Sequence, residues 1–324
     1  MLQRDLFIEA VRKKMKKNKN IYFLSADFGA IALDKLRKEF PDRFVHCGIC
    51  EQAMIDMATG LALNNKIVFV YAMAPFLSLR ALEQIKCGPG LMKLPINILS
   101  VGIGLGYADS GPTHYATEDF ACIRTIVGSS IYTLSSPNQC KALANYVIKK
   151  PHFTYIRFDR HETININKNI KNKDIINGYK IFGKPSKKKV LLLSHGKVSY
   201  TAYKSYNLNT KKFYFIDLIR SKPMPKNLKS FLSKNKGIIV IDEQYVDGGL
   251  ASSIFEYCSK INLFVKIKTI SLPDKYIYLN GGRNYLLKKY KFSNEGILEK
   301  YNQLISRWLL AERHIEFLFL AVAR

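Results

Sequence analysis

One carboxylate, Glu51, stands where an acidic side chain could do chemistry. It follows a glycine-containing turn at Gly48 and lies in the first turn of an expected helix, whose apolar residues recur at helical spacing from Ile55 to Ala62. A carboxylate in that place faces the end of a sheet, where ligands bind in α/β proteins. The competing interpretation is an acid that only stabilises the positive end of the helix dipole. The residue and its position leave both interpretations open.

A histidine and two arginines are the other candidates for chemistry. His114 follows Gly111 and Pro112 in an expected loop after a strand, and rigid turns of this kind aim side chains into clefts. An imidazole can donate or accept protons near neutral pH, although a lone histidine is more often structural. Arg157 and Arg160 stand three positions apart, so they do not share one strand face. At the strand end Arg160 could enter a site, and a surface arginine is the alternative.

Residues 1–165 alternate between apolar runs and helix-period segments, which predicts a βαβ domain. The runs are rich in Ile, Val, Phe and Tyr, and their continuous hydrophobicity predicts strands that are buried on both faces of the sheet. The expected strands cover 21–26, 66–72, 96–102 and 153–158, and the expected helices cover 6–15, 31–40, 52–63, 76–85 and 138–150.

A second, smaller α/β domain is expected over 189–306. Residues 166–188 are rich in Asn, Lys and Gly, a composition typical of a linker or surface crossover. Further apolar runs then alternate with helices and predict a parallel or mixed sheet. The last segment, 307–324, has an apolar face that suits a docking helix or a remnant of cloning. The expected fold class is therefore two consecutive α/β domains followed by a tail of undecided role.

The formal net charge of +26 raises the question of nucleic-acid binding, since clustered Lys and Arg follow phosphates. The lysines are instead spread through turns and helix ends, and no recognition motif accompanies them. We expect no nucleic-acid partner, although anionic small substrates would be attracted. No run approaches the roughly 18 uninterrupted apolar residues of a membrane helix, and the N-terminus lacks the apolar block of a secretory signal. We therefore expect no membrane association and a cytoplasmic location.

Six cysteines, at 47, 50, 87, 122, 140 and 258, lack the spacing of a zinc site or a disulfide framework. Cys47 and Cys50 form a single CxxC, which suits a redox pair or half of a metal site, but no second pair follows. Packing thiols are the favoured interpretation, and we assign no metal ligand to this chain.

An ordered set of motifs resembles the transketolase family. GICEQAMIDMATGLAL, from 48 to 63, resembles the Gly-Ile-Ala-Glu-Gln motif and following helix of transketolases and 1-deoxyxylulose-5-phosphate synthases. SADF at 25–28, SGPTHYATEDFA at 110–121 and YIRFDR at 155–160 match further family elements in the same order. In the second half, DLIRSKPM and IIVIDEQYVDGGLASSIFEY are similar to the family's C-terminal domain. The resemblance covers nearly all of the chain up to the tail.

The resemblance implies a pyrimidine-binding domain for thiamine diphosphate, a cofactor that becomes a nucleophile when its thiazolium C2 proton is lost. Glu51 would hydrogen-bond the pyrimidine N1′ and favour the tautomer whose nitrogen takes that proton. Phe76 matches the first aromatic position of the pyrimidine slot, with an ordinary core aromatic as the alternative. The family's next two aromatics are replaced by Leu79 and Leu82. The other cofactor contacts expected from matching motifs are Asp27, Phe28 and Ile49.

The resemblance also implies a substrate side of the site. His114, in the Gly-Pro-Thr-His segment, would bind substrate oxygens and assist proton transfer. Ser110 replaces the aspartate with which transketolases bind a donor hydroxyl, and Asp109 stands one step away. Arg160 would hold a substrate phosphate through a bidentate fork, with Arg157 as a second substrate-binding candidate.

The chain lacks the Gly-Asp-Gly motif and the following asparagines with which the family holds the diphosphate through Mg²⁺. The DGG at 247–249 lies in the second domain and is not followed by those asparagines. The family's two cofactor-binding domains meet at a dimer interface, so the resemblance implies a separate N-terminal subunit that holds most of the diphosphate and Mg²⁺. The expected assembly is a heterodimer or a dimer of heterodimers that acts on small sugar substrates.

The favoured hypothesis is the C-terminal subunit of a split transketolase-like transferase, which moves a two-carbon ketol unit between sugar phosphates or related sugars. Related alternatives are a 1-deoxyxylulose-5-phosphate synthase-like subunit and the β-type subunit of a 2-oxo acid dehydrogenase. The Gly-Pro-Thr-His sequence favours the first two of these three enzymes. An alternative of another class is a non-catalytic interaction protein with the same fold. Loss of Glu51 or His114 would have indicated such a protein, but both residues are present.

Overall fold

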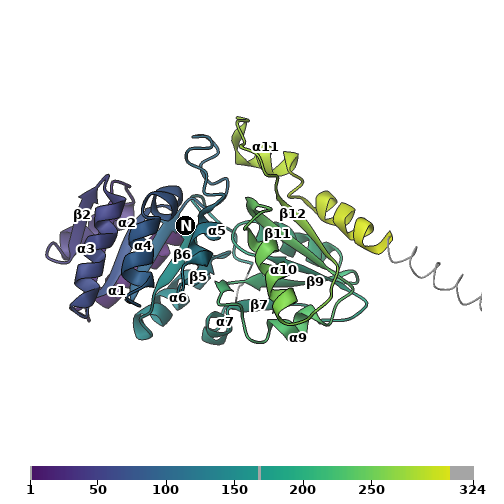
Figure 1. Cartoon of the computed structure of the whole chain (residues 1–324), viewed down its shortest axis with the longest axis horizontal. Helices are drawn as coiled ribbons and strands as arrows, with labels where there is room; N and C mark the ends of the chain where they lie inside the picture. Colours follow the sequence, from purple (N-terminus) through teal and green to yellow (C-terminus); the bar gives the residue numbers. More distant parts are fainter. Residues whose placement is uncertain (1, 167–168, 307–324) are drawn as a thin grey trace, which may run out of the picture.

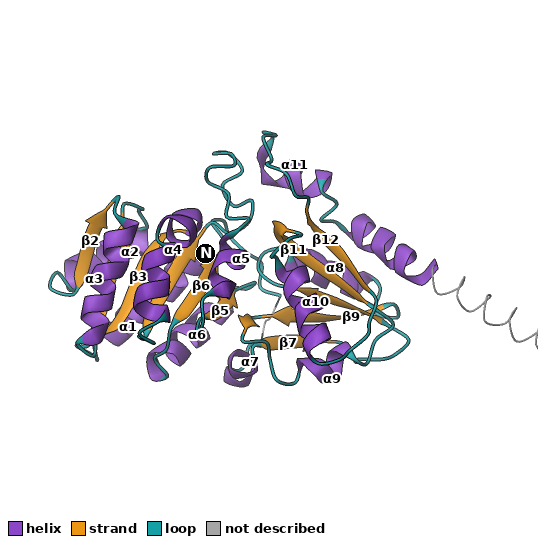
Figure 2. Ribbon diagram, viewed as in Figure 1, coloured by secondary structure: helices purple, strands orange, loops and turns teal. Residues whose placement is uncertain are grey.

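The protein contains two β-sheets that lie beside each other, each covered by helices (Figure 1). This computed structural model describes residues 2–166 and 169–306, so the predicted tail 307–324 lies outside the described residues. Figure 2 shows helices on both faces of each sheet. The architecture confirms the predicted fold class of two consecutive α/β units.

The first sheet has seven strands, six of them parallel, with β10 antiparallel at one edge. Neighbouring residues on a strand, such as Phe23 and Leu24, face opposite cores, which explains why these strands are apolar throughout. In spatial order the strands are β10 (Arg220–Lys222), β5 (Ser130–Thr133), β6 (Thr154–Phe158), β4 (Ile96–Val101), β3 (Ile67–Met73), β1 (Ile21–Ala26) and β2 (Phe44–Gly48).

Two groups of helices cover the faces of this sheet. On one face lie α1 (Gln3–Met15), α2 (Ile31–Glu39), α6 (Asn138–Lys149) and α7 (Asn172–Asn177). On the other lie α3 (Glu51–Leu63), the π-helical turns η1 (Phe76–Arg80) and η2 (Lys86–Gly90), α4 (Leu82–Ile85) and α5 (Asp119–Thr125). The helix predicted over 76–85 is thus broken into a π turn and a short α-helix.

The second sheet has five strands, four parallel and one antiparallel, which confirms the expectation of a parallel or mixed sheet. In spatial order they are β12 (Ile267–Leu272), β11 (Ile238–Tyr245), β8 (Val190–Ser194), β9 (Phe213–Leu218) and β7 (Tyr179–Phe182). One face packs against α8 (Ser199–Leu208), α11 (Gly282–Lys289) and a helix that includes residues 294–306, and the other packs against α9 (Leu228–Leu232) and α10 (Leu250–Lys260).

Residues 166–188 differ from the linker predicted there. Within them α7 packs into the first core through Ile175, and β7 pairs antiparallel with β9 of the second sheet. In the other direction, β10 comes from the second half of the sequence and completes the first sheet beside β5. The Asn and Lys content concealed these elements, because a short edge strand or a single-turn helix needs little apolar surface to pack. The two halves are therefore joined by shared elements.

The carboxyl ends of five parallel strands meet at one edge of the first sheet, where ligands bind in α/β folds. Each expected site residue other than Arg157 follows one of these strand ends, which explains how segments far apart in the sequence reach one place. Asp27 and Phe28 follow β1, Glu51 follows β2, Phe76 follows β3, Ser110 and His114 follow β4, and Arg160 follows β6.

Candidate active site

Glu51 is a buried carboxylate at the start of α3. Gly48 ends β2 with a φ of +67°, a left-handed conformation that glycine adopts without strain, and this turn leads into the helix. The Glu51 side chain is 4% exposed, and its Oε2 accepts a hydrogen bond of 2.7 Å from Arg80 Nη1. The Arg80 side chain is 42% exposed, so the buried carboxylate meets a cation that approaches from the solvent side.

Phe76 and Arg80 are the first and last residues of η1. The guanidinium carbon of Arg80 lies 4.5 Å from the centre of the Phe76 ring, so one planar cation rests on the ring and bonds Glu51 at the same time. Single π turns of this kind are frequent at functional sites. Leu79 is 49% exposed and Leu82 packs against the core, where the family has further aromatics.

A row of side chains in contact lies beside Glu51 and consists of Phe76, His114, Tyr107 and Arg160. The His114 ring meets Phe76 edge-on with centroids 5.5 Å apart, and Tyr107 lies 6.3 Å from His114. The Arg160 guanidinium carbon is 4.3 Å from the centre of the Tyr107 ring, and the same guanidinium pairs with the Asp109 carboxylate. The hydrogen bond from Arg160 lowers the pKa of Asp109. The row thus runs from the buried carboxylate to a partly exposed ion pair.

Tyr107 is a member of this row that the sequence motifs did not identify. Its ring packs between Phe28, His114 and Arg160. Burial raises the pKa of Tyr107 to about 12, so its phenol is neutral at physiological pH. The available signal was its place in the glycine-rich loop GIGLGYADSG after β4, since such loops hold side chains in fixed directions.

Replacing Gly102 by alanine is expected to displace Tyr107 and to lower the free energy of unfolding by about 1–3 kcal/mol. An added Cβ would lie 1.9 Å from the Tyr107 ring, and the φ of Gly102 is +87°. Urea titration measures the loss. Alanine at Gly29 is the matched control, because nothing lies within 4 Å of the added Cβ there. Equal stability of the two variants would contradict the expected clash.

Asp27, Ile49 and Ser110 lie at the surface of the same sheet edge. The Asp27 side chain is 59% exposed, with Oδ1 4.0 Å from His46 Nε2, and Ile49 is 72% exposed. The Asp27 backbone N–H donates to the Gly48 carbonyl at 3.0 Å, which ties the end of β1 to the turn before α3. The predicted contacts of these three residues with cofactor or substrate stay predictions.

Arg157 does not join the row. It is 1% exposed, and its guanidinium donates two hydrogen bonds of 2.8 Å to the Asp119 carboxylate and one to Thr133. Its Nη1 also lies 3.4 Å from Nε2 of His195, which contacts Asp242 in the second half at 2.8 Å. All three guanidinium nitrogens thus already donate to buried partners, and the predicted contact of Arg157 with substrate stays a prediction.

A second buried arginine, Arg283, joins the two halves. It donates to Asp159 in the first half at 2.9 Å and to Glu243 in the second half at 2.8 Å. Burial raises the pKa of Glu243. The backbone N–H of Leu105 also donates to Glu243, at 3.2 Å, so the loop that carries Tyr107 is anchored on the second half.

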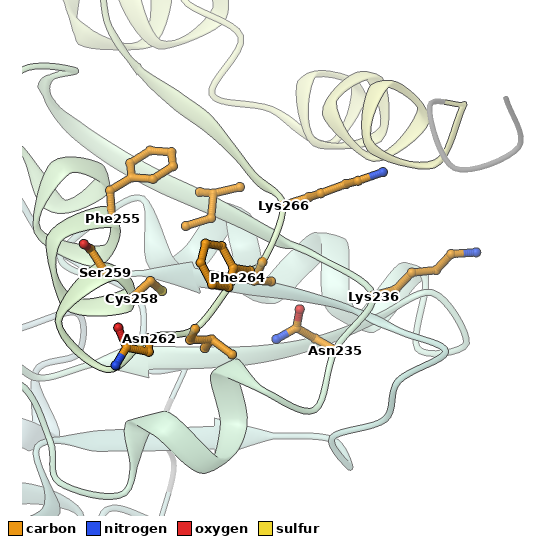
Figure 3. Close-up of a pocket in the computed structure, with 11 residues that line it drawn as sticks. Asn235, Lys236, Phe255, Cys258, Ser259, Asn262, Phe264 and Lys266 are labelled. Carbon is orange, nitrogen blue, oxygen red and sulfur yellow. The ribbon is translucent and has the colours of Figure 1, made fainter. Parts of the chain in front are cut away.

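Other features outside the row carry no comparable chemistry. The second half has a groove of about 680 Å³. Figure 3 shows Phe255 and Cys258 of α10 near Phe264 in this groove. No predicted site residue lines it. Across residues 2–166 and 169–306, no cluster of three or more His, Cys, Asp or Glu side chains could hold a metal ion, and no helix is long and apolar enough to cross a membrane. All six cysteines are free, and burial raises the pKa of Cys47 to about 11.

Comparison with known proteins identifies related sequences over most of the chain. Residues 1–164 match the family described as transketolase, pyrimidine binding domain. One of the separately named subunits of the apulose-4-phosphate transketolase of Phocaeicola vulgatus is 26% identical over 316 residues, which cover 94% of this chain and 97% of that subunit. The 1-deoxy-D-xylulose-5-phosphate synthase of Dictyoglomus thermophilum is 30% identical over 276 residues, which cover 83% of this chain and 43% of that enzyme.

A solved structure has the same fold. It is a split gene transketolase in the form of an inactive beta4 tetramer, with a TM-score of 0.79 and 21% identity, and the match covers 94% of this chain and 98% of that one. The chain therefore spans nearly the full length of separately encoded subunits and less than half the length of the synthase. It belongs to the transketolase family, and over nearly all of its length it is similar to separately encoded transketolase subunits.

Proposed function

We propose that this chain forms the pyrimidine side of a thiamine-diphosphate site and, with a partner subunit, transfers a two-carbon ketol unit between sugar phosphates or related sugars. Transketolases and 1-deoxyxylulose-5-phosphate synthases use thiamine diphosphate, which supplies the nucleophilic carbon for breaking and forming carbon–carbon bonds. One observation carries the proposal: Glu51 and Phe76 together hold a single planar nitrogen donor, the Arg80 guanidinium.

The residues of the site fit an aminopyrimidine. Such a ring needs an apolar face to stack on and a carboxylate to bond its nitrogen edge. The Arg80 guanidinium is flat and carries N–H groups, and it makes both contacts, 4.5 Å from the Phe76 ring centre and 2.7 Å from Glu51. The guanidinium thus resembles the expected aminopyrimidine in shape and polarity. Asp27, Phe28 and Ile49 would complete the cofactor contacts.

The rest of the row provides the substrate side of the site. His114 would bind substrate oxygens and move a proton there, and the 2.9 Å contact of its Nδ1 with Thr113 Oγ1 leaves Nε2 for that task. Arg160 would bind a substrate phosphate in exchange for Asp109, because ion pairs near the surface are weak. Tyr107 supports both residues through ring contacts.

We assign the diphosphate and Mg²⁺ to a separate subunit that carries the diphosphate-binding domain. This chain has no Gly-Asp-Gly motif. Ile49 and Leu79, beside the site, are 72% and 49% exposed, as suits a surface that a partner covers. The split gene transketolase with the same fold is described as an inactive beta4 tetramer. The proposed complex is a cytoplasmic heterodimer or dimer of heterodimers.

The isolated chain is expected to bind thiamine diphosphate with Mg²⁺ at least about 100-fold more weakly than the complex with its partner. Two lost charge-assisted hydrogen bonds, of about 1.5–3 kcal/mol each, account for such a factor. Calorimetric titration of the chain, the partner and the complex measures it, and ketol transfer should appear only in the complex. Tight binding by the chain alone would refute the half-site. Formation of 1-deoxyxylulose 5-phosphate by the complex would favour the synthase alternative.

A further inference from the structure

We propose that Arg80 is a built-in competitor of the cofactor: its guanidinium contacts both Glu51 and Phe76 and must leave when the pyrimidine ring enters. This inference rests on the proposed function. The two residues assigned to the pyrimidine are the same two that Arg80 contacts, at 2.7 Å and 4.5 Å. Two planar groups cannot occupy one ring face and one carboxylate edge together, so the two occupants exclude each other.

Glu51 needs a hydrogen-bond partner because its carboxylate is buried. A carboxylate that is 4% exposed is costly to leave without a partner. Among the described residues, Arg80 is the hydrogen-bond partner of the Glu51 side chain. Arg80 therefore stabilises the subunit while the cofactor is absent, and the pyrimidine would take over that role when it binds.

The exposure of Arg80 distinguishes this pair from a permanent structural ion pair. In the pair of Arg157 with Asp119, both side chains are at most 1% exposed, so neither can leave without exposing a buried charge. In the pair of Arg80 with Glu51, the cation is 42% exposed and reaches the carboxylate from outside. A guanidinium that is already partly hydrated leaves at small cost.

The structure also provides a place for the displaced side chain. Arg80 lines a groove of about 940 Å³ beside α4, together with Leu79, Glu83 and Leu91. Glu83 offers a second carboxylate within that groove. Arg80 is the last residue of the π turn, and the following residue, Ala81, leaves helical geometry with φ −106° and ψ 20°. In the proposed exchange, the Arg80 side chain would turn into this groove and leave Glu51.

The test measures cofactor affinity in the complex of this chain with its diphosphate-binding partner. Arg80→Gln is expected to lower the dissociation constant of thiamine diphosphate by about threefold to fivefold, because the competing ion pair is gone. Arg37→Gln is the matched control: it also removes one positive charge, from a pair with Asp34 at the exposed end of α2, and should leave the affinity unchanged. Isothermal titration calorimetry at two salt concentrations gives both values.

A second readout separates displacement from a merely structural role. In the free chain, Arg80→Gln should lower the melting temperature, since Glu51 loses its hydrogen-bond partner, whereas saturating cofactor should restore the melting temperature of the complex to that of wild type. Arg80→Lys keeps the charge without the planar fork and should give intermediate values. Unchanged or weaker cofactor binding by Arg80→Gln would overturn the inference and leave the proposed function standing. Absence of cofactor binding by the wild-type complex would overturn both.

Discussion

Replacing Glu51 by glutamine is expected to reduce thiamine-dependent ketol transfer in the assembled enzyme by about 10²–10⁴-fold. Glutamine keeps the size of the side chain but cannot carry the negative charge that, in the proposed site, would bond and polarise the pyrimidine nitrogen. The effect should be on kcat at saturating cofactor, because the missing interaction belongs to activation of the cofactor and not only to its binding. Steady-state kinetics with a coupled assay, with cofactor held in excess, measures this.

The control for this experiment is Asp56→Asn. Asp56 is an exposed carboxylate on the same helix, α3, so its loss changes the net charge equally without touching the site. Far-UV circular dichroism checks that both variants fold. If Glu51→Gln kept wild-type kcat in a folded complex, the assignment of Glu51 as the activating carboxylate would fail, together with the mechanism proposed for this chain.

Replacing Arg157 by methionine is expected to lower the free energy of unfolding by about 3–5 kcal/mol. The Asp119 side chain is fully buried, and removal of its partner would leave an unpaired charge beside Tyr155, whose hydroxyl donates to the same carboxylate at 3.1 Å. Equilibrium unfolding in urea gives the difference. The double variant Arg157→Met with Asp119→Leu should recover much of the loss, since no buried charge then remains.

Arg37→Met is the comparison for this prediction, because its pair with Asp34 is more than half exposed and should contribute about 1 kcal/mol or less. The same measurements decide between the two roles considered for Arg157. Normal stability with a raised KM for sugar phosphates would restore Arg157 as a substrate ligand. Lost stability with an unchanged KM in the surviving folded enzyme fits the buried ion pair.

Long apolar runs were sufficient to predict most of the sheet. Strands such as β1 and β8 are buried on both faces, so their sequences are apolar except for one serine each and stand out in the chain. Strands β5, β7 and β10 have only three or four residues each, and β7 and β10 lie at sheet edges. Their pairing depends on contacts from distant parts of the sequence, which local composition does not record.

The sequence motifs mark residues that follow strand ends, and they do not record tertiary contacts. The family motifs located Glu51 and His114 because each follows a strand that ends at the same edge of the sheet. Arg80 was passed over because η1 was expected to be α-helical, and a π turn shifts the direction of the side chains that follow. For Arg157, the motif could not show that Asp119, 38 positions earlier, already accepts hydrogen bonds from Nε and Nη2 of its guanidinium.

The pairing of β10 with the first sheet has a consequence for truncated forms of this protein. A fragment that ended near residue 165 would lack β10, and the outer edge of β5 would present unpaired backbone N–H and C=O groups. Such an edge is a template on which strands of other molecules add, and the fragment would also lack Ile175 and Ile219 of the first core, so it would tend to aggregate. Experiments that exchange or express domains should therefore keep the two halves of this chain together.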